Sequence, residues 1–236
     1  MRQVHSFEKY CRNINQILAE NSENAGWTLM DLGAYEEARR WFEITVQAIL
    51  RGDRLGRVDH EAQGGCLHQI GQCLMLEGKF DSARWWYEQA IQAKRKGNMV
   101  RWVNHDSIGR SMHQIGRCLE SVGNMDMARQ WYSTAVEEKR LGDLEGRADF
   151  DSVGRSLHRV GICLMKSQLH DSARRWFEMA AEAKSKGNSD GEVDFGSLSN
   201  TLHQIGNCVA KMGNPNGAAH WEERAVLASR RVESNE

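Results

Sequence analysis

The nonapeptide SMHQIGRCL, at residues 111–119, is one of four close copies in the chain. Each copy begins 45 residues after the one before it, and no insertion interrupts the series. A spacing this constant is typical of a repeat architecture, in which each unit packs only against its neighbours. The other copies are CLHQIGQCL at 66–74, SLHRVGICL at 156–164 and TLHQIGNCV at 201–209.

A series of tryptophans extends the repeat by one unit toward the N-terminus. These residues keep the same 45-residue spacing and are Trp41, Trp86, Trp131, Trp176 and Trp221. Glu222 stands where the earlier repeats have Phe or Tyr, which we interpret as the end of the stack. We therefore predict a single domain over 1–236, with five repeats at approximately 6–52, 59–97, 104–142, 149–187 and 194–232.

Each repeat has the pattern of two helices. In the second repeat, Leu67, Ile70 and Leu74 recur with the helical period, and Gly78 follows as a helix-ending glycine. Segment 79–94 then resumes a helical pattern. The chain has one proline, so little interrupts these helices, since proline inside a helix costs about 3 kcal/mol.

Three motifs in the second repeat, L-x-x-I-G-x-x-L (67–74), G-x-x-x-x-A (78–83) and A-x-x-x-Y-x-x-A (83–90), resemble the tetratricopeptide repeat. The spacing is 45 residues rather than 34, and the usual terminal proline is missing. The chain is thus similar to the long-repeat subclass found in kinesin light chains and bacterial regulatory proteins. The resemblance implies an all-α, right-handed α-solenoid of five helix-turn-helix repeats. It also implies binding of peptides or proteins and no enzyme activity.

The composition points to a globular protein with no strong overall field. The net charge is −1, so nothing global attracts the chain to nucleic acid or anionic lipid. No secretory leader and no apolar run of membrane-spanning length occur, which favours the cytoplasm or another reducing compartment. Four cysteines occupy one repeat position and are expected to be unbridged thiols in the core: Cys73, Cys118, Cys163 and Cys208.

The repeated His and Cys do not form a chemical pair. His68 and Cys73 are five residues apart, which places them about 140° apart around a helix. They therefore cannot share a metal ion or a proton, and we expect no metal site, no cofactor and no catalytic residue. Two interpretations of the histidine stay open. It is either a structural residue retained through duplication or one step in a series of hydrogen-bond donors along a ligand groove.

By the resemblance, the histidine position faces the concave groove of the superhelix. The polar residues around it vary from repeat to repeat, as expected of a binding surface on a constant scaffold. They also make the middle of the groove basic. The partner-binding candidates are His68, Gln72, Arg110, His113, Arg117, Arg155, His158, Arg159, His203 and Asn207.

Other conspicuous residues are interpreted as packing or solvation. The five repeated tryptophans are expected to pack between repeats. Trp85 and Trp102 lie outside that series and are candidates for exposed contact residues. A basic stretch comes near the end of three second helices, as Lys94-Arg95-Lys96, Lys139-Arg140, and Lys184 with Lys186. We expect solvated cations there that complement the helix dipole.

We predict a protein–protein interaction scaffold or adaptor that binds an acidic partner segment in its groove. Arg155 and Arg159 fall where chaperone-tail-binding tetratricopeptide proteins place the Lys and Arg of a carboxylate clamp, so a C-terminal carboxylate, an Asp/Glu-rich segment and a phosphorylated segment all remain open. One alternative is a structural subunit that uses its convex face and ends, and a homo-oligomer is compatible with either. Single-stranded nucleic-acid binding is the other alternative, disfavoured because only repeats 3 and 4 are basic.

Overall fold

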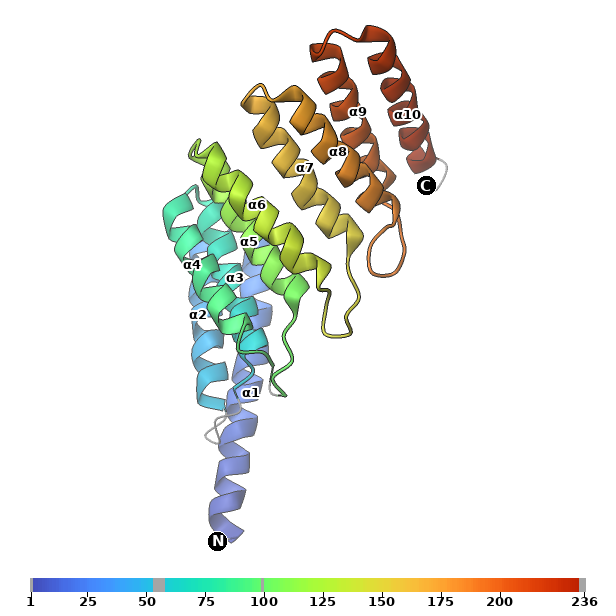
Figure 1. Cartoon of the computed structure of the whole chain (residues 1–236). Coiled ribbons are helices and arrows are strands. Elements are labelled where there is room, and N and C mark those ends of the chain that lie inside the picture. Colours follow the sequence, from blue (N-terminus) through green and yellow to red (C-terminus); the bar gives the residue numbers. More distant parts are fainter. Residues whose placement is uncertain (1, 53–57, 99, 234–236) are drawn as a thin grey trace. The chain divides into compact units, whose positions relative to one another are not determined.

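The computed structural model describes residues 2–52, 58–98 and 100–233, which form ten α-helices and no strand (Figure 1). None of the helices within these ranges is both long and apolar enough to cross a bilayer. The helices form five consecutive pairs, so the predicted all-α solenoid of five helix-turn-helix repeats is confirmed. They are α1 (Arg2–Asp31), α2 (Tyr35–Gly52), α3 (His60–Leu76), α4 (Phe80–Lys94), α5 (His105–Ser121), α6 (Met125–Arg140), α7 (Phe150–Lys166), α8 (His170–Ser185), α9 (Phe195–Lys211) and α10 (Pro215–Glu233).

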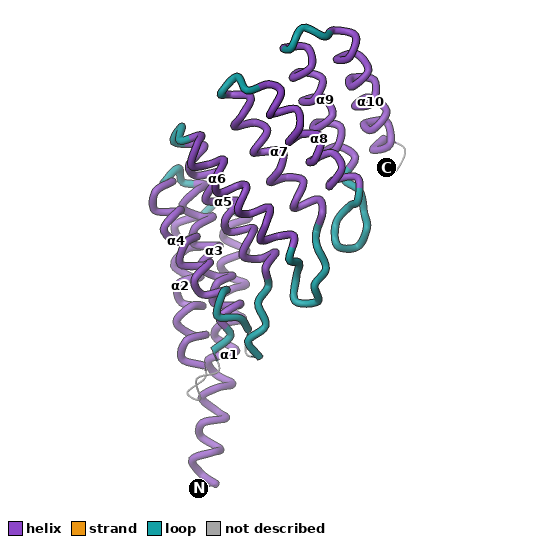
Figure 2. The backbone as a smooth tube through the Cα atoms, in the orientation of Figure 1, coloured by secondary structure: helices purple, strands orange, loops and turns teal. Residues whose placement is uncertain are grey.

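The chain divides into two compact units, Met1–Asn104 with α1 to α4 and His105–Glu236 with α5 to α10. Within each unit, every helix packs against the next one along the chain. In the second unit the short turns inside each pair lie at one end of the helices, and the longer links between pairs lie at the other (Figure 2). That the five repeats form one continuous domain stays a prediction.

A left-handed residue ends the first helix of each pair. Gly33, Gly78, Gly123 and Gly213 have φ between 76° and 81°, the conformation that a glycine cap adopts without strain. After Gly78, the N–H of Lys79 donates to the carbonyl oxygen of Leu74 at 2.8 Å, which closes the helix end. The fourth repeat has Gln168 at this position, with φ of 60°. Its side chain makes that conformation unfavourable.

The links between pairs share one hydrogen-bond pattern. Asn98, Asp143 and Asn188 each accept, through the side-chain oxygen Oδ1, from the backbone N–H groups two and four residues later. The distances are 2.8–3.1 Å. The carbonyl oxygen of Gly142 also accepts from the N–H of Asp106 at 3.0 Å, which ties the link to the start of α5. The carbonyl oxygen of Gly187 accepts from the N–H of Asp151 at 3.0 Å in the same way, so these two links are held against the starts of α5 and α7.

Within a repeat, the two helices approach closely because a glycine faces an aromatic ring. A Cβ atom added at Gly116 would lie 2.6 Å from Cε1 of Tyr132, which is fully buried. The same arrangement joins Gly71 to Tyr87 and Gly161 to Phe177. Between repeats, Trp176 packs against an apolar cluster formed by Val136, Val153, Leu157, Ala180 and Ala183. This packing agrees with the prediction at Trp176, whereas Trp41, in the first repeat, is 39% exposed.

The repeated cysteines are buried thiols, as predicted. Burial raises the pKa of Cys73, Cys163 and Cys208 to about 11, because a thiolate is poorly solvated there. Cys66 is also buried, and its pKa rises to about 12 for the same reason. These thiols belong to the packing of the helices.

Candidate functional site

The repeated histidine joins one repeat to the next. In the second unit, Nδ1 of His113 lies 2.9 Å from the hydroxyl oxygen of Ser156, and Nδ1 of His158 lies 3.1 Å from that of Thr201. Each hydroxyl belongs to the first helix of the following repeat. The hydrogen bond to the next repeat uses one of the two ring nitrogens of each histidine. It supports the structural interpretation for that nitrogen.

A buried lysine approaches the same hydroxyl group. Nζ of Lys139 donates to Ser156 Oγ at 3.0 Å and to the carbonyl oxygen of Ser152 at 2.9 Å. Nζ of Lys184 donates to Thr201 Oγ1 at 2.8 Å and to the carbonyl oxygen of Ser197 at 2.9 Å. We call the sets His113–Lys139–Ser156 and His158–Lys184–Thr201 the polar clusters. Each holds two successive repeats together.

The lysines correct a prediction made from the sequence. Lys94, Lys139 and Lys184 were expected to be solvated, yet they are 3%, 2% and 3% exposed. Lys139 and Lys184 are buried because the following repeat packs over the end of the second helix. A glycine makes room for the lysine stem: a Cβ atom at Gly109 or Gly154 would lie within 2.5 Å of the lysine Cγ.

Burial controls the protonation of both clusters. It lowers the pKa of His158 to about 3 and that of His113 well below 6.5, and the neighbouring lysine adds to the effect. Both imidazoles are therefore neutral at pH 7. Burial also lowers the pKa of Lys139 to about 7 and that of Lys184 to about 8, although nearby aspartates act in the opposite direction.

A pocket of about 550 Å³ lies over these clusters, on the first helices of the second unit. We call it the basic pocket. It brings together five of the predicted binding residues: His113, Arg117, Arg155, His158 and Arg159. The other residues that line it are Ile162, Lys184, Ser197, Asn200 and Gln204. Its lining contains four cationic side chains and no carboxylate.

Each arginine of the basic pocket is held by a neighbour. Arg155 Nη1 lies 2.8 Å from Asp151 Oδ2, one turn earlier on α7. Arg159 Nη1 lies 3.5 Å from Glu120 Oε2 on α5. Both carboxylates are largely buried, whereas the two arginine side chains are 53% and 40% exposed. A guanidinium has five N–H donors, so a single neighbour leaves donors for a ligand.

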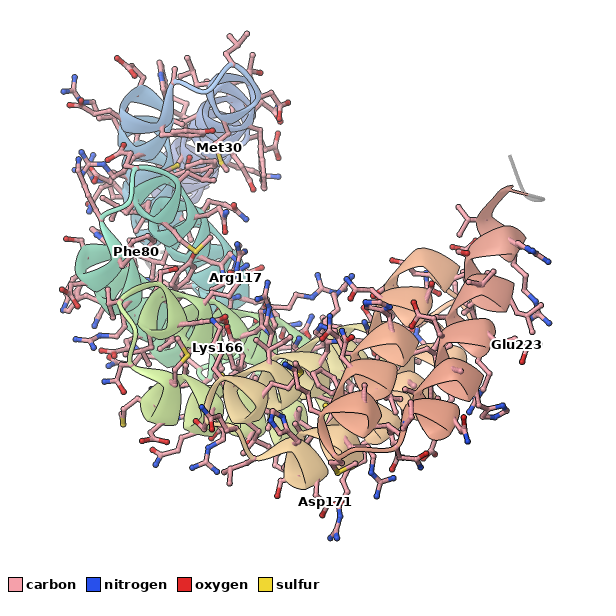
Figure 3. All side chains as sticks on the ribbon, turned by 90° about the horizontal axis from the view of Figure 1, so that it is seen from above. Met30, Phe80, Arg117, Lys166, Asp171 and Glu223 are labelled. Atoms are coloured by element: carbon pink, nitrogen blue, oxygen red, sulfur yellow. The ribbon has the colours of Figure 1, made fainter. Side chains whose placement is uncertain are left out.

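The third arginine comes from the preceding repeat. Arg117 Nη1 donates to Oε1 of Gln114 at 3.2 Å, a neutral partner on the same helix. Figure 3 shows Arg117 on one side of the second unit, and Asp171, at the start of α8, on the opposite side. The basic pocket therefore belongs to the side formed by the first helices.

Five other predicted residues lie outside the lining of the basic pocket. Arg110 Nη2 pairs with Asp106 Oδ2 at 2.7 Å, one turn earlier on α5. His203 Nδ1 lies 2.7 Å from Glu222 Oε1, at the position where earlier repeats have an aromatic ring. The other three are Asn207, His68 and Gln72, and none of the five lines the basic pocket.

The two candidate aromatic contacts are exposed, as predicted. Trp85 lies on α4 and is 52% exposed, and Trp102 lies in the link after α4 and is 62% exposed. Neither belongs to a first helix. Neither tryptophan lines the basic pocket.

The sequence analysis missed Lys184 and Gln204 as part of a common site with the arginines and Asn200. Their signal was present in the repeat register, since Asn200 and Gln204 stand 45 residues after Arg155 and Arg159. Residues at equal register lie side by side on successive first helices. Across the described part of the chain, no three His, Cys, Asp or Glu side chains lie together as metal ligands would.

Residues 65–96 and 109–140 match the profile of the tetratricopeptide repeat. These two stretches of the chain are tetratricopeptide repeats. No curated protein sequence matches it. The resemblance read from the motifs is therefore confirmed at two of the repeats in which it was recognised.

Solved structures of tetratricopeptide proteins share the fold. BtubC (BKLC) from P. vanneervenii is 15% identical, with a TM-score of 0.71 over 96% of this chain and 92% of that chain. The repeats of a putative kinesin light chain from Podosopora anserina are 14% identical, with a TM-score of 0.63 over 91% and 96%. YrrB, a tetratricopeptide protein described as having an unusual peptide-binding site, is 16% identical, with a TM-score of 0.54 over 88% and 84%. At these identities the likeness shows the fold.

Proposed function

We propose that this tetratricopeptide protein is an interaction scaffold that binds an acidic segment of a partner protein in the basic pocket. The observation that carries the proposal is the lining of the pocket, with three arginines and a lysine and no carboxylate. Guanidinium groups bind carboxylates and phosphates through paired hydrogen bonds. Such a surface binds a partner and performs no catalytic step.

The support comes from how the arginines are presented. Arg155 and Arg159 stand one helical turn apart on α7, and Arg117 reaches the same pocket from α5. Each is oriented by a neighbouring side chain before any ligand arrives, which lowers the entropy lost on binding. YrrB, with the same fold, carries a peptide-binding site. A peptide in the basic pocket is the corresponding proposal for this chain.

The test compares two arginines in matched settings. Arg155 and Arg110 occupy equivalent positions 45 residues apart, and each pairs with a buried aspartate one turn earlier. Only Arg155 lines the basic pocket. We expect Arg155→Gln to weaken binding of a fluorescein-labelled pool of Asp/Glu-rich nonapeptides about tenfold, and Arg110→Gln to leave it within about twofold.

Anisotropy titrations at 0.15 M salt measure both effects, and circular dichroism checks that both variants are folded. Arg117→Gln is a second pocket variant, whose loss leaves no buried charge because its partner is Gln114. Equal effects of the Arg155 and Arg110 substitutions would move binding away from the basic pocket. Absence of any binding by the wild-type protein would refute the proposal.

A second candidate function is assembly through the first unit. It is favoured by Trp85 and Trp102, together with Val100, which is 66% exposed in the same link as Trp102. Exposed tryptophans contribute strongly when an interface covers them. A protein that assembles in this way would no longer form its complex when Trp85 and Trp102 are both replaced by alanine. Size-exclusion chromatography of the native assembly measures this loss. It would keep that complex in the Arg155→Gln variant.

A further inference from the structure

The basic pocket has more positive charge and more donor directions than one carboxylate can use. We propose that it recognises a phosphorylated side chain on the partner, a phosphate monoester dianion rather than an Asp or Glu carboxylate. This inference rests on the proposed function, because it names the chemistry of the segment bound in the same pocket. It is carried by the charge and the geometry of the lining.

The charges of the basic pocket do not cancel. Four cations line it, namely Arg117, Arg155, Arg159 and Lys184. The two carboxylates in contact with these arginines are Asp151 and Glu120, and both lie largely buried beneath the guanidinium groups. Two carboxylates against four cations leave an excess of two positive charges around the pocket. Lys184 is 3% exposed, so the arginines carry the charge that a ligand can contact. A phosphate monoester carries roughly −1.5 to −2 at pH 7, whereas a carboxylate carries a single charge.

The donors come from three successive first helices. Arg117 comes from α5, Arg155 and Arg159 come from α7, and the amides of Asn200 and Gln204 stand in the same register on α9. A phosphate group offers three oxygens in tetrahedral directions, which donors on several helices can reach together. A carboxylate is planar and is satisfied by a single bidentate arginine. Donors spread over three helices therefore favour the tetrahedral anion.

The neutral histidines complete the selectivity. His113 and His158 line the pocket, and burial keeps their pKa values below 6.5, so they add no charge at pH 7. Their Nδ1 atoms bond to the next repeat. The anion therefore meets oriented arginines beside two neutral histidines, each of which is hydrogen-bonded to the next repeat. The pocket volume of about 550 Å³ also leaves room for a side chain that carries the phosphate and for its flanking backbone.

The experiment uses three pools of labelled nonapeptides with a C-terminal amide. The flanking positions are degenerate mixtures of Gly, Ala, Asp and Glu, and the central residue is phosphoserine, glutamate or serine. We expect the phosphoserine pool to bind the full-length protein at least tenfold more tightly than the glutamate pool at 0.15 M salt. Arg117→Gln and Arg155→Gln should each reduce that ratio to below threefold, whereas Arg110→Gln should leave it unchanged.

The outcomes separate the inference from the proposed function. Equal binding of the glutamate and phosphoserine pools, with loss in the Arg155→Gln variant, would refute phosphate selectivity and leave acidic-segment binding in place. No binding of either pool would refute both. Inorganic phosphate is added as a competitor: half-displacement only above about 10 mM supports a peptide-borne phosphate, whereas displacement in the micromolar range would show that the site takes the free ion instead. An unaltered ratio in both arginine variants would also overturn the inference.

Discussion

Replacing Gly116 by alanine should destabilise the second unit through one contact. The added Cβ atom would lie 2.6 Å from Cε1, 2.7 Å from Cδ1 and 3.0 Å from Cζ of Tyr132. The ring cannot easily move away. It is fully buried, its hydroxyl donates to Glu120 Oε2 at 2.9 Å, and its face neighbours His113 at 5.0 Å between ring centroids. The helices must therefore separate or the ring must leave its position.

Gly206 provides the matched control. It occupies the same place in the fifth repeat, where Glu222 replaces the aromatic residue, and the atom nearest to an added Cβ is the carbonyl oxygen of Ala218 at 3.4 Å. Both substitutions gain about 1 kcal/mol from the higher helix propensity of alanine. Only the substitution at Gly116 incurs the overpacking cost, typically about 1–3 kcal/mol. The difference between the two variants should therefore be about 1–3 kcal/mol, with Gly116→Ala the less stable.

Urea unfolding followed by far-ultraviolet circular dichroism measures both variants against the wild type. Leucine at Gly116 should cost still more, several kcal/mol, because it extends further into the ring. Removing the ring in the double variant Gly116→Ala, Tyr132→Leu should make the two substitutions less than additive. The proposed helix pairing is refuted if Gly116→Ala proves as stable as Gly206→Ala.

Three further predictions concern other parts of the fold. Gln168→Gly should raise stability by about 1 kcal/mol, because it removes a side chain from a left-handed conformation, whereas Gly123→Gln should lower it; thermal melts compare the two. His158 should lower the free energy of unfolding by about 2 kcal/mol between pH 7 and pH 5, since the unfolded imidazole takes up a proton that folded His158 does not. In His158→Gln the fall should be smaller by that amount. A thiol reagent should label the native protein far more slowly than the urea-unfolded protein, and rapid native labelling would contradict the burial of Cys73, Cys118, Cys163 and Cys208.

The helix pairs could be predicted because their signals are local or strictly periodic. Gly78 ends a helix by its own backbone conformation, and the motif around His113 repeats without insertion. The contact between Gly116 and Tyr132 also follows from the repeat, since a residue without a side chain recurs opposite a recurring aromatic. Periodicity of this kind identifies both the elements and their neighbours.

The burial of Lys139 and Lys184 could not be predicted in the same way. A lysine in the last turn of a helix is usually solvated, and nothing adjacent in the sequence indicates otherwise. What buries these side chains is the first helix of the next repeat, whose Ser156 or Thr201 accepts the hydrogen bond. The sequence signal for this burial is a set of three residues that vary together at the 45-residue spacing. They are the lysine, the glycine beside the lysine side chain, and the hydroxyl-bearing residue of the following repeat.

The fifth repeat shows that these positions belong together. Where the earlier repeats have Gly154 and Lys184, it has Ser199 and Ser229, and the hydroxyl of Ser199 donates to the carbonyl oxygen of Ala225 at 2.8 Å. The glycine is replaced where the lysine stem is absent. The polar clusters therefore form only where a lysine, its glycine and a following hydroxyl all occur.

On the surface of the first helices, the positions that stay constant and the positions that vary have different roles. His113 and His158 recur because each must meet a hydroxyl of the next repeat. The neighbouring register positions change freely: Arg155 is followed by Asn200, and Arg117 by Ile162. Arg155 and Arg117 are held by Asp151 and Gln114 on their own helices, so their remaining N–H donors are available for recognition. The basic pocket forms where this variation places arginines around two constant, neutral histidines, so the histidines act as structural residues and the arginines as the proposed ligand contacts.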